Sequence, residues 1–474
     1  MNGNTRRAAA SWDAAAGDDI AMAWLQEIWS ALGGDARGLG AVGIAGEGGL
    51  QSAFAVSDLA AAAIAVAGLA AAELMSVRSG EMPTVRVDRR LASLWFGWTL
   101  RPQGWSLPSP WDPFTGDYEA ADGWVRLHAN APHHREAALS ALDVRADREA
   151  VARAVAGRLA EELETAVTER GGCAAALRSG AQWAAHPQGA SVAGEPLLWL
   201  EATEAAAAGL PPAMPGRPLA GLRVLDLTRV LAGPVATRFL AMLGAEVLRI
   251  DSPSWDEPGV VPEVTLGKRC ARLDLRRDED RQHLAGLLRG ADILVHGYRP
   301  GALAKLGFDG EALRRLRPGL VDVSLAAYGW TGPWAGRRGF DSLVQTCAGI
   351  AAEGMRRAGA PKPVPLPVQA LDHATGYLMA AAAIRGITRR LTTGRGSVAR
   401  CSLARTARLL WSGTGSDREV PLLPAAPADY AAAVEATPWG PAQRLLPPLA
   451  IDGVQVVSEH PAARLGSAAA AWSS

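Results

Sequence analysis

Short apolar runs alternate with helix-length stretches through the second half of the chain. Four of these runs have strand length and lie at 222–227, 246–251, 291–296 and 320–325. Helical stretches are expected between the first two runs, over 235–243, and before the last run, over 310–316. Strands that follow one another through short joints and a helix pair in parallel. The pattern therefore predicts an α/β fold built on a doubly wound parallel sheet.

Ligands of such sheets bind at the carboxyl ends of the strands, which here means the loops 228–234, 296–300 and 326–332. The first loop contains one Gly and a Pro and lacks the Gly-x-Gly-x-x-Gly pattern. This disfavours a nicotinamide or flavin cofactor, although Asp251 stands where a ribose-binding acid would lie. The sequence also lacks a phosphate-binding P-loop and a Gly-x-Ser-x-Gly elbow.

The first half of the chain has a different character. An amphipathic helix is expected over 20–32, and a hairpin-type turn precedes a strand at 124–128. Helices are expected from Pro132, over 146–170 and over 173–185. We therefore divide the chain into an N-terminal extension (1–40), a partial repeat (41–105), a smaller α+β domain (106–202), a linker (203–217), the main α/β domain (218–412) and a C-terminal tail (413–474).

One unit of helix, turn and strand is repeated within the chain. In both copies an Asp precedes an Ala-rich helix, a Gly follows the Asp by 22 residues, and an Arg follows it by 28. Each copy ends at a Trp. The matched pairs are Asp58 and Asp372, Gly80 and Gly394, Arg86 and Arg400, and Trp95 and Trp411. Spacing this regular predicts two copies of one structural element.

The second copy opens with Leu-Asp-His-Ala-Thr-Gly-Tyr at 371–377. Asp is a preferred N-cap, and the positive end of the helix dipole stabilises an ionised carboxylate. We therefore expect Asp372 to cap this helix in its charged form. From these residues alone, capping is a more common role than catalysis. Asp58 has the same context without the Thr-Gly-Tyr and is expected to be structural.

Composition narrows the classes of function. The 474 residues carry 48 basic and 48 acidic side chains, and this balance argues against a nucleic-acid-binding protein. The four Cys residues are scattered, and His133 and His134 are adjacent, so no metal site is expected. The Cys usage favours a reducing cytoplasm. The apolar run 59–74 is short for a membrane span, so we expect a buried helix and no membrane association.

Seven motifs between 216 and 412 occur in the order of a known family. They are PLAGLRVLDLTRVLAGP, LGAEVLRID, GKRCARLDLR, ADILVHGYRPGALAKLGFD, RPGLVDVSLAAYGWTGP, RGFDSLVQ and ALDHATGYLMA. This part of the chain resembles the family III CoA-transferases, which include formyl-CoA and carnitine CoA-transferases and, as a divergent branch, α-methylacyl-CoA racemases. The resemblance implies a Rossmann-like domain with a smaller α+β domain, a soluble homodimer, and no permanently bound cofactor.

The resemblance also implies the chemistry and its residues. Asp372 matches the family's catalytic nucleophile, which moves CoA between an acyl-CoA thioester and a carboxylic acid through an anhydride and an aspartyl-CoA thioester. The helix N-terminus would keep Asp372 ionised, and its N–H groups would hold the oxyanion. The positions that match the family's CoA contacts are Arg229, Val230, Leu231, Ala232, Lys268, Arg269, Gly297, Tyr298, Ala302 and Tyr328.

The order of the segments departs from the family. Residues 117–200 resemble its small domain, which here precedes the Rossmann-like part, and 50–95 resembles the Asp-helix-strand element. Two alternatives stay open: an acyl-CoA racemase or isomerase, and a non-catalytic CoA-binding paralogue. The racemase branch has a His where this chain has Phe340, which disfavours racemisation. His373 is expected to point away from Asp372.

Overall fold

A seven-stranded sheet forms the centre of the molecule. The computed structural model describes residues 18–205, 209, 211–212, 214–413 and 420–473. The strand order is β10-β9-β8-β11-β12-β13-β7, and every pair is parallel except β13 with β7. The strands are β7 (Trp199–Ala205), β8 (Arg223–Leu227), β9 (Glu246–Asp251), β10 (Lys268–Arg272), β11 (Ile293–His296), β12 (Val321–Ala326) and β13 (Arg395–Ser402). The order reverses between β8 and β11, as in doubly wound folds, which confirms the predicted fold class.

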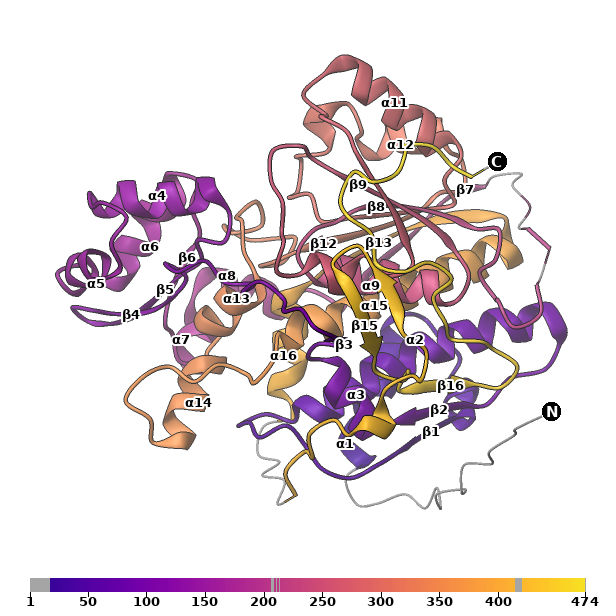
Figure 1. Cartoon of the computed structure of the whole chain (residues 1–474), viewed down its shortest axis with the longest axis horizontal. Coiled ribbons are helices and arrows are strands. Elements are labelled where there is room, and N and C mark those ends of the chain that lie inside the picture. The colour runs from indigo at the N-terminus through magenta and orange to yellow at the C-terminus, as the bar shows by residue number, and fades with distance from the viewer. Residues whose placement is uncertain (1–17, 206–208, 210, 213, 414–419, 474) are drawn as a thin grey trace.

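Helices cover both faces of this sheet, because each strand alternates its side chains between two apolar layers. Val224 packs in the layer formed by α9 (Ala232–Met242) and α15 (Ala370–Thr393). Its neighbour Leu225 packs in the opposite layer. That layer is formed by α11 (Asp278–Arg289) and α12 (Gly310–Leu316), which lie above the sheet in Figure 1, with α9 and α15 below it.

The internal repeat is present in three dimensions. The first copy is α2 (Val56–Ser79), β2 (Val85–Asp88) and α3 (Arg89–Trp95), and the second is α15, β13 and α16 (Leu403–Trp411). Both long helices have 24 residues and end at a left-handed Gly. A strand pairs in parallel with each copy, β1 (Val42–Ala45) with β2 and β12 with β13. The helices α2 and α15 pack against each other, so the two copies share one core.

The smaller α+β unit lies to one side of the sheet (Figure 1). Its sheet contains β4 (Gly116–Ala120), β5 (Gly123–Leu127) and β6 (Ala174–Ala176), and its helices are α4 (Pro132–Leu142), α5 (Arg148–Ala156) and α6 (Ala160–Glu169). The predicted helix over 173–185 is wrong at its start. The three Ala residues of β6 pair with β5, and only α7 (Gly180–Ala185) is helical, followed by α8 (Pro187–Gly194). Strand pairing here overrides the helix propensity of Ala.

Strand β7 also departs from the expected layout. Residues 199–205 were assigned to the small domain and linker, yet they form the antiparallel edge strand of the large sheet. The tail returns to the first copy, where β15 (Gly440–Arg444) pairs with β3 (Leu100–Pro102) and β16 (Leu449–Ile451) pairs with β2. The remaining elements are α1 (Asp18–Ala31), η1 (Ala36–Ala41), α10 (Val261–Val264), η2 (Ala304–Leu306), α13 (Asp341–Cys347), α14 (Ile350–Ala358), η3 (Pro427–Asp429) and β14 (Glu435–Thr437).

Among the described helices, only α2 has the length and apolar composition of a membrane span. Most of its residues are buried inside the fold, where it packs between α1 and α15. The expectation of a buried helix over this apolar run is therefore confirmed.

Candidate active site

Asp372 lies in the first turn of α15, not at its cap. The helix begins at Ala370, and the N-cap residue Gln369 makes no capping hydrogen bond with its side chain. The Ala370 N–H donates to the Val368 carbonyl at 2.8 Å and closes a tight turn, and the helix starts three residues earlier than the sequence suggested. The prediction that Asp372 is the N-cap is therefore wrong. Its side chain is buried at the mouth of the helix, with the residue 6% exposed.

The capping carboxylate belongs instead to Asp341, the first residue of α13. Its Oδ2 accepts the backbone N–H of Asp372 at 2.9 Å. Gln345 donates to the other oxygen of Asp341 and itself accepts the Leu366 N–H at 2.8 Å. A capping carboxylate can thus be supplied from a distant helix and satisfy an orphan donor of the first turn.

This arrangement places two buried carboxyl groups side by side. Burial and the charge of Asp341 raise the pKa of Asp372 well above its ordinary value. Burial likewise raises the pKa of Asp341 to about 6, although its hydrogen bonds from Asp372 and Gln345 oppose the rise. This direction is opposite to the expected effect of the helix terminus, because desolvation and a like charge both favour the neutral form of Asp372.

Three of the first-turn N–H groups are already used. Ala370 donates to Val368, and Asp372 donates to Asp341. His373 donates its backbone N–H to the Gln369 carbonyl at 3.1 Å. These three N–H groups are therefore not free for the predicted oxyanion role.

The aromatic neighbours bear on proton-transfer chemistry. The His373 ring stacks on Phe96 with centroids 5.1 Å apart, which confirms that it points away from Asp372. Burial lowers the pKa of His373 to about 3. Phe340 stacks on His128 of the small domain at 3.9 Å. Phe340, the residue next to Asp341 in sequence, therefore supplies no titratable group.

The loop 229–232 adjoins α15 directly. Gly376, one turn into α15, lies so close to α9 that a Cβ atom there would be 2.4 Å from the Ala232 carbonyl oxygen. Leu231 is the N-cap residue of α9, and Ala232 is its first residue. The Thr-Gly-Tyr that distinguishes the second copy thus contains the Gly that lets these two helix starts approach.

Val230 in this loop has a strained backbone, with φ at 64°. A β-branched residue rarely adopts this conformation, and such strain clusters at functional sites. Its N–H donates to both oxygens of the buried Glu257, at 3.1 and 3.2 Å. Val230, Glu257, Trp255 and Phe340 line a cavity of about 190 Å³ between this loop and the small domain.

Arg229 and the loop after β11 lie at the switch point between β8 and β11. The Arg229 guanidinium donates to the Trp255 carbonyl at 2.8 Å and lies over the Trp255 ring. Burial raises the pKa of Tyr298, and Arg229 lies near enough to oppose this rise. Gly297 is exposed and Ala302 is half-buried in the same loop. The structure thus brings Arg229, Val230, Leu231 and Ala232 together with this loop at the carboxyl edge.

Tyr328 lies deeper in the molecule. It is 1% exposed, packs edge-on against Trp334, and its hydroxyl has no hydrogen-bond partner. Burial raises its pKa well above the ordinary value.

Two predicted CoA contacts do not join the others. Lys268 is fully buried, and its ammonium donates to Asp226, Thr237 and the Pro234 carbonyl, which uses all three of its protons. Arg269 lies at the amino end of β10, where it binds Glu246 and the Ala471 carbonyl. These positions tie the sheet together, and the geometry does not present them to a ligand.

Among the described residues, the first copy has no counterpart of the carboxylate pair. Asp58 is the third residue of α2, as Asp372 is of α15. The turns before the two helices also match, because the Val56 N–H donates to the Phe54 carbonyl. However, Asp58 forms a buried two-pronged ion pair with Arg89, at 2.9 and 3.3 Å. The equivalent of Arg89, first in α16, is Leu403. The prediction of a structural role for Asp58 agrees with this pairing.

Sequence reasoning missed Asp341 and Glu257 as parts of the site. Asp341 stands in the quoted motif RGFDSLVQ, which was the available signal, but its partner lies 31 residues away. Glu257 lies in an irregular stretch without a motif. In the described part of the chain, no group of three His, Cys, Asp or Glu side chains is placed to hold a metal ion.

Comparison with known proteins gives the context for this site. The family model of "CoA-transferase family III" matches residues 219–417. An acetyl-coenzyme A transferase of Hypoxylon pulicicidum is 36% identical over 39% of this chain and 32% of its own length. An acyl-CoA transferase of Gibberella moniliformis is 32% identical over 59% of this chain and 53% of its own. A succinyl-CoA:glutarate CoA-transferase of Mus musculus is 33% identical over 40% and 45%.

Among solved structures, the crystal structure of a hypothetical protein from Mycobacterium tuberculosis aligns with a TM-score of 0.38 and 31% identity, covering 42% of this chain and 58% of that one. The chain spans about a third to a half of the length of the curated relatives named above. The rearranged order of the segments stays a prediction. Residues 219–417 of this chain match the model of CoA-transferase family III, and the resemblance is confirmed for this part.

Proposed function

We propose that this protein transfers CoA between an acyl-CoA thioester and a carboxylic acid, with Asp372 as the nucleophile. The Asp372 carboxylate attacks the thioester carbonyl, the C–S bond breaks, and CoA leaves as the thiolate from a mixed anhydride. The thiolate then attacks the aspartyl carbonyl and releases the donor's carboxylate. An acceptor carboxylate attacks the aspartyl-CoA thioester, and the returning thiolate takes the acceptor's acyl group. Asp372 is regenerated, with no net proton, electron or water consumed.

The observation that carries this proposal is the buried pair of Asp372 and Asp341 at the mouth of α15. An ionised Asp372 is destabilised there by desolvation and by a like charge. Acylation removes the charge of Asp372, so formation of the intermediate relieves both penalties. Burial also keeps water away from an anhydride that it would hydrolyse.

Trapping of the acyl-enzyme tests the nucleophile. The protein is incubated with acetyl-CoA or succinyl-CoA and hydroxylamine and then digested, and the masses of its peptides are measured by mass spectrometry. We expect a hydroxamate on the peptide that contains Asp372 and none on the peptide that contains Asp58, which serves as an internal control because it shares the helix context. The Asp372→Asn variant should remain unmodified. A folded protein that binds CoA and gives no adduct would support a non-catalytic CoA-binding paralogue instead.

The racemase or isomerase alternative receives no support from this geometry. Phe340 offers no proton carrier, and His373 is stacked on Phe96. We expect no exchange of the α-proton of 2-methylacyl-CoA in deuterium oxide. Exchange that disappears in Asp372→Asn would favour the racemase.

The remaining features of the proposal follow from the family resemblance. The loops 229–232 and 297–302 hold CoA at the switch point, where doubly wound sheets bind their ligands. No cofactor is bound permanently. The protein works as a cytoplasmic homodimer without a nucleic-acid or membrane partner. Native mass spectrometry tests the dimer, and a monomer that is fully active would contradict it.

A further inference from the structure

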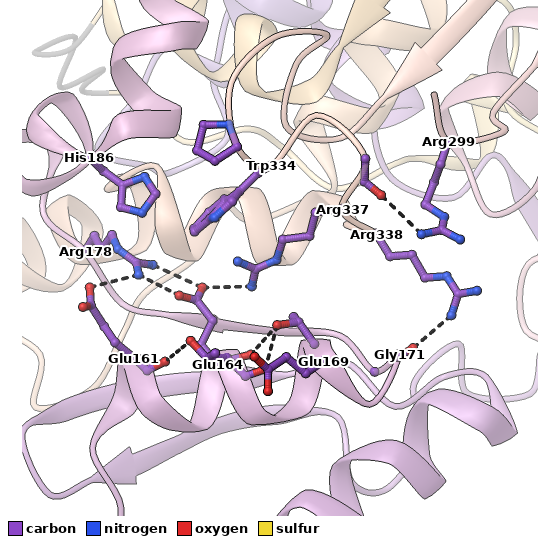
Figure 2. Close-up of a pocket in the computed structure, with 15 residues that line it drawn as sticks. Glu161, Glu164, Glu169, Gly171, Arg178, His186, Arg299, Trp334, Arg337 and Arg338 are labelled. Atoms are coloured by element: carbon purple, nitrogen blue, oxygen red, sulfur yellow. Dashed lines mark hydrogen bonds and ion pairs between the residues drawn. The ribbon is translucent and has the colours of Figure 1, made fainter. Parts of the chain in front are cut away.

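A cleft of about 770 Å³ separates the small unit from the loop that follows β12 (Figure 2). One wall is α6, and the other is the segment from Pro333 to Arg338 together with Arg299 from the loop after β11. This volume lies in the range of small-molecule sites. Four Arg side chains line it, and they differ in whether carboxylates neutralise them.

One half of the cleft is internally neutralised. Arg178 binds Glu164 at 2.6 Å and Glu161 at 2.9 Å, and Arg337 binds Glu164 at 3.1 Å. The Arg337 guanidinium also lies 4.1 Å from the Trp334 ring centroid. Figure 2 shows these groups gathered on the side of the cleft next to His186. They form a fixed polar wall with one aromatic face.

The other half carries two guanidinium groups without a carboxylate. Arg299 donates to the Gly336 carbonyl at 3.2 Å, and Arg338 donates to the Gly171 carbonyl at 2.9 Å. Among the described residues, no Asp or Glu oxygen lies within 4.0 Å of either group. Each guanidinium has five N–H donors, so most donors of both groups remain for a ligand.

These two charges are close enough to affect each other. Partial burial and the positive charge of Arg338 lower the pKa of Arg299. Both groups also act on the same thiol: burial raises the pKa of Cys173 to about 12, and Arg338, Arg337 and Arg299 oppose that rise. Two like charges gathered in one cleft repel each other, and an anion between them removes the repulsion.

We propose that Arg299 and Arg338 form a binding site for a small molecule with a dianionic oxyanion head, either a phosphate group or a dicarboxylate. Guanidinium forks bind both of these groups in a bidentate manner. Arg299 follows Tyr298 on the loop that leaves β11, so one lining residue of the cleft belongs to the switch-point loop. The site does not require CoA transfer to occur, because it is built from residues other than Asp372 and Asp341.

Calorimetric titration of the full chain tests this site with inorganic phosphate, ADP and glutarate as probes. We expect at least one probe to bind, and its affinity to fall about tenfold or more in Arg299→Ala/Arg338→Ala. Arg170→Ala is the matched control, because Arg170 is exposed at the end of α6 and does not line the cleft. This control should bind as the unmodified chain does.

The phosphate and glutarate arms distinguish the two kinds of ligand, and tight binding of either supports the site. Arg299→Lys/Arg338→Lys should retain part of the affinity, since the charge stays while the fork is lost. If the double Ala variant fails to fold, Arg299→Ala alone replaces it, because Arg299 is exposed. Equal affinity in the Ala variants, or no binding of any probe to the full chain, would overturn the proposal.

Discussion

The backbone N–H of Asp372 donates a 2.9 Å hydrogen bond to Oδ2 of Asp341, across 31 residues of sequence. One carboxylate therefore caps the helix that carries the other. The hydrogen bond fixes the orientation of the first turn, while the negative charge of Asp341 opposes ionisation of Asp372. Position and acidity of the proposed nucleophile are thus set by the same residue.

Asp341→Asn should move the rising limb of the pH profile to lower pH. Asn retains an oxygen that can accept the Asp372 N–H, but it removes the charge that raises the pKa of Asp372. Since the ionised form attacks, kcat/KM for CoA transfer should reach its plateau at lower pH than in the unmodified protein. The variant retains Arg126, whose positive charge lowers the pKa of Asp341 in the unmodified protein.

Glu279→Gln serves as the control for this profile, because Glu279 is an exposed acid on α11. Its profile should match that of the unmodified protein. An Asp341→Asn profile that also coincides with the unmodified one would show that Asp341 does not tune Asp372.

Asp372→Asn should stabilise the fold at neutral and alkaline pH. The raised pKa of Asp372 means that the folded state binds its proton more tightly than the unfolded chain, whose ordinary value is 3.8. Stability therefore falls as pH rises from about 4 through the raised pKa. Removing this buried charge should raise the free energy of unfolding at pH 8 by roughly 1–3 kcal/mol. Urea unfolding at pH 8 and pH 3.5 measures the difference, which should vanish at the lower pH.

Four of the seven strands of the large sheet, β8, β9, β11 and β12, were predictable because their apolar runs are short and locally bounded. Both copies of the repeat were predictable for a similar reason, since the spacing from Asp to Gly to Trp is contained in each segment. The role of Asp341 was not, because the sequence does not show that α13 caps α15. Lys268 was misjudged because a basic residue in sequence carries no sign of its burial. The roles of Asp341 and Lys268 both depend on contacts between elements that are distant in sequence.

Arg89→Leu should strongly destabilise the first copy of the repeat. Leu is the residue at the equivalent position 403 of the second copy, so the side chain suits this type of helix start. The substitution breaks the buried ion pair between Arg89 and Asp58 and should cost about 3–5 kcal/mol. The double variant Asp58→Asn/Arg89→Leu should recover part of this loss. Chemical denaturation of Arg89→Leu, Asp58→Asn and the double variant gives the coupling energy, and a value near zero would contradict a structural ion pair.

Lys268→Met should lower stability while leaving CoA affinity of the folded protein unchanged. Met fills a similar volume but leaves the buried Asp226 carboxylate without its ammonium partner, which should cost about 3–5 kcal/mol. The Lys268 ammonium donates all three of its protons to acceptors inside the fold, so it has no donor left for a CoA phosphate. Thermal unfolding and CoA titration at a temperature well below unfolding separate the two effects. A large loss of CoA affinity with little loss of stability would restore Lys268 as a ligand contact.

Gly376→Ala sets helix propensity against packing at the proposed active site. Within a helix, Ala is favoured over Gly by about 1 kcal/mol. At this position, however, the new Cβ would meet the Ala232 carbonyl at 2.4 Å and Val235 at 2.9 Å. The backbone carbonyl cannot move aside as a flexible side chain can. The overpacking cost of about 1–3 kcal/mol should therefore exceed the gain in helix propensity, and the variant should be less stable. The helix starts of α9 and α15 must then separate, and the loop 229–232 should move with them.

The matched control is Gly386→Ala, further along the same helix. Its Cβ would also be crowded, by Val321 at 2.5 Å and Ser397 at 2.6 Å, yet it lies away from the loop 229–232. Both variants should lose stability, whereas only Gly376→Ala should weaken CoA binding and slow acylation of Asp372. CoA titration and the hydroxylamine trap measure this contrast. Equal effects of the two substitutions on CoA binding would mean that the contact between α9 and α15 serves packing alone.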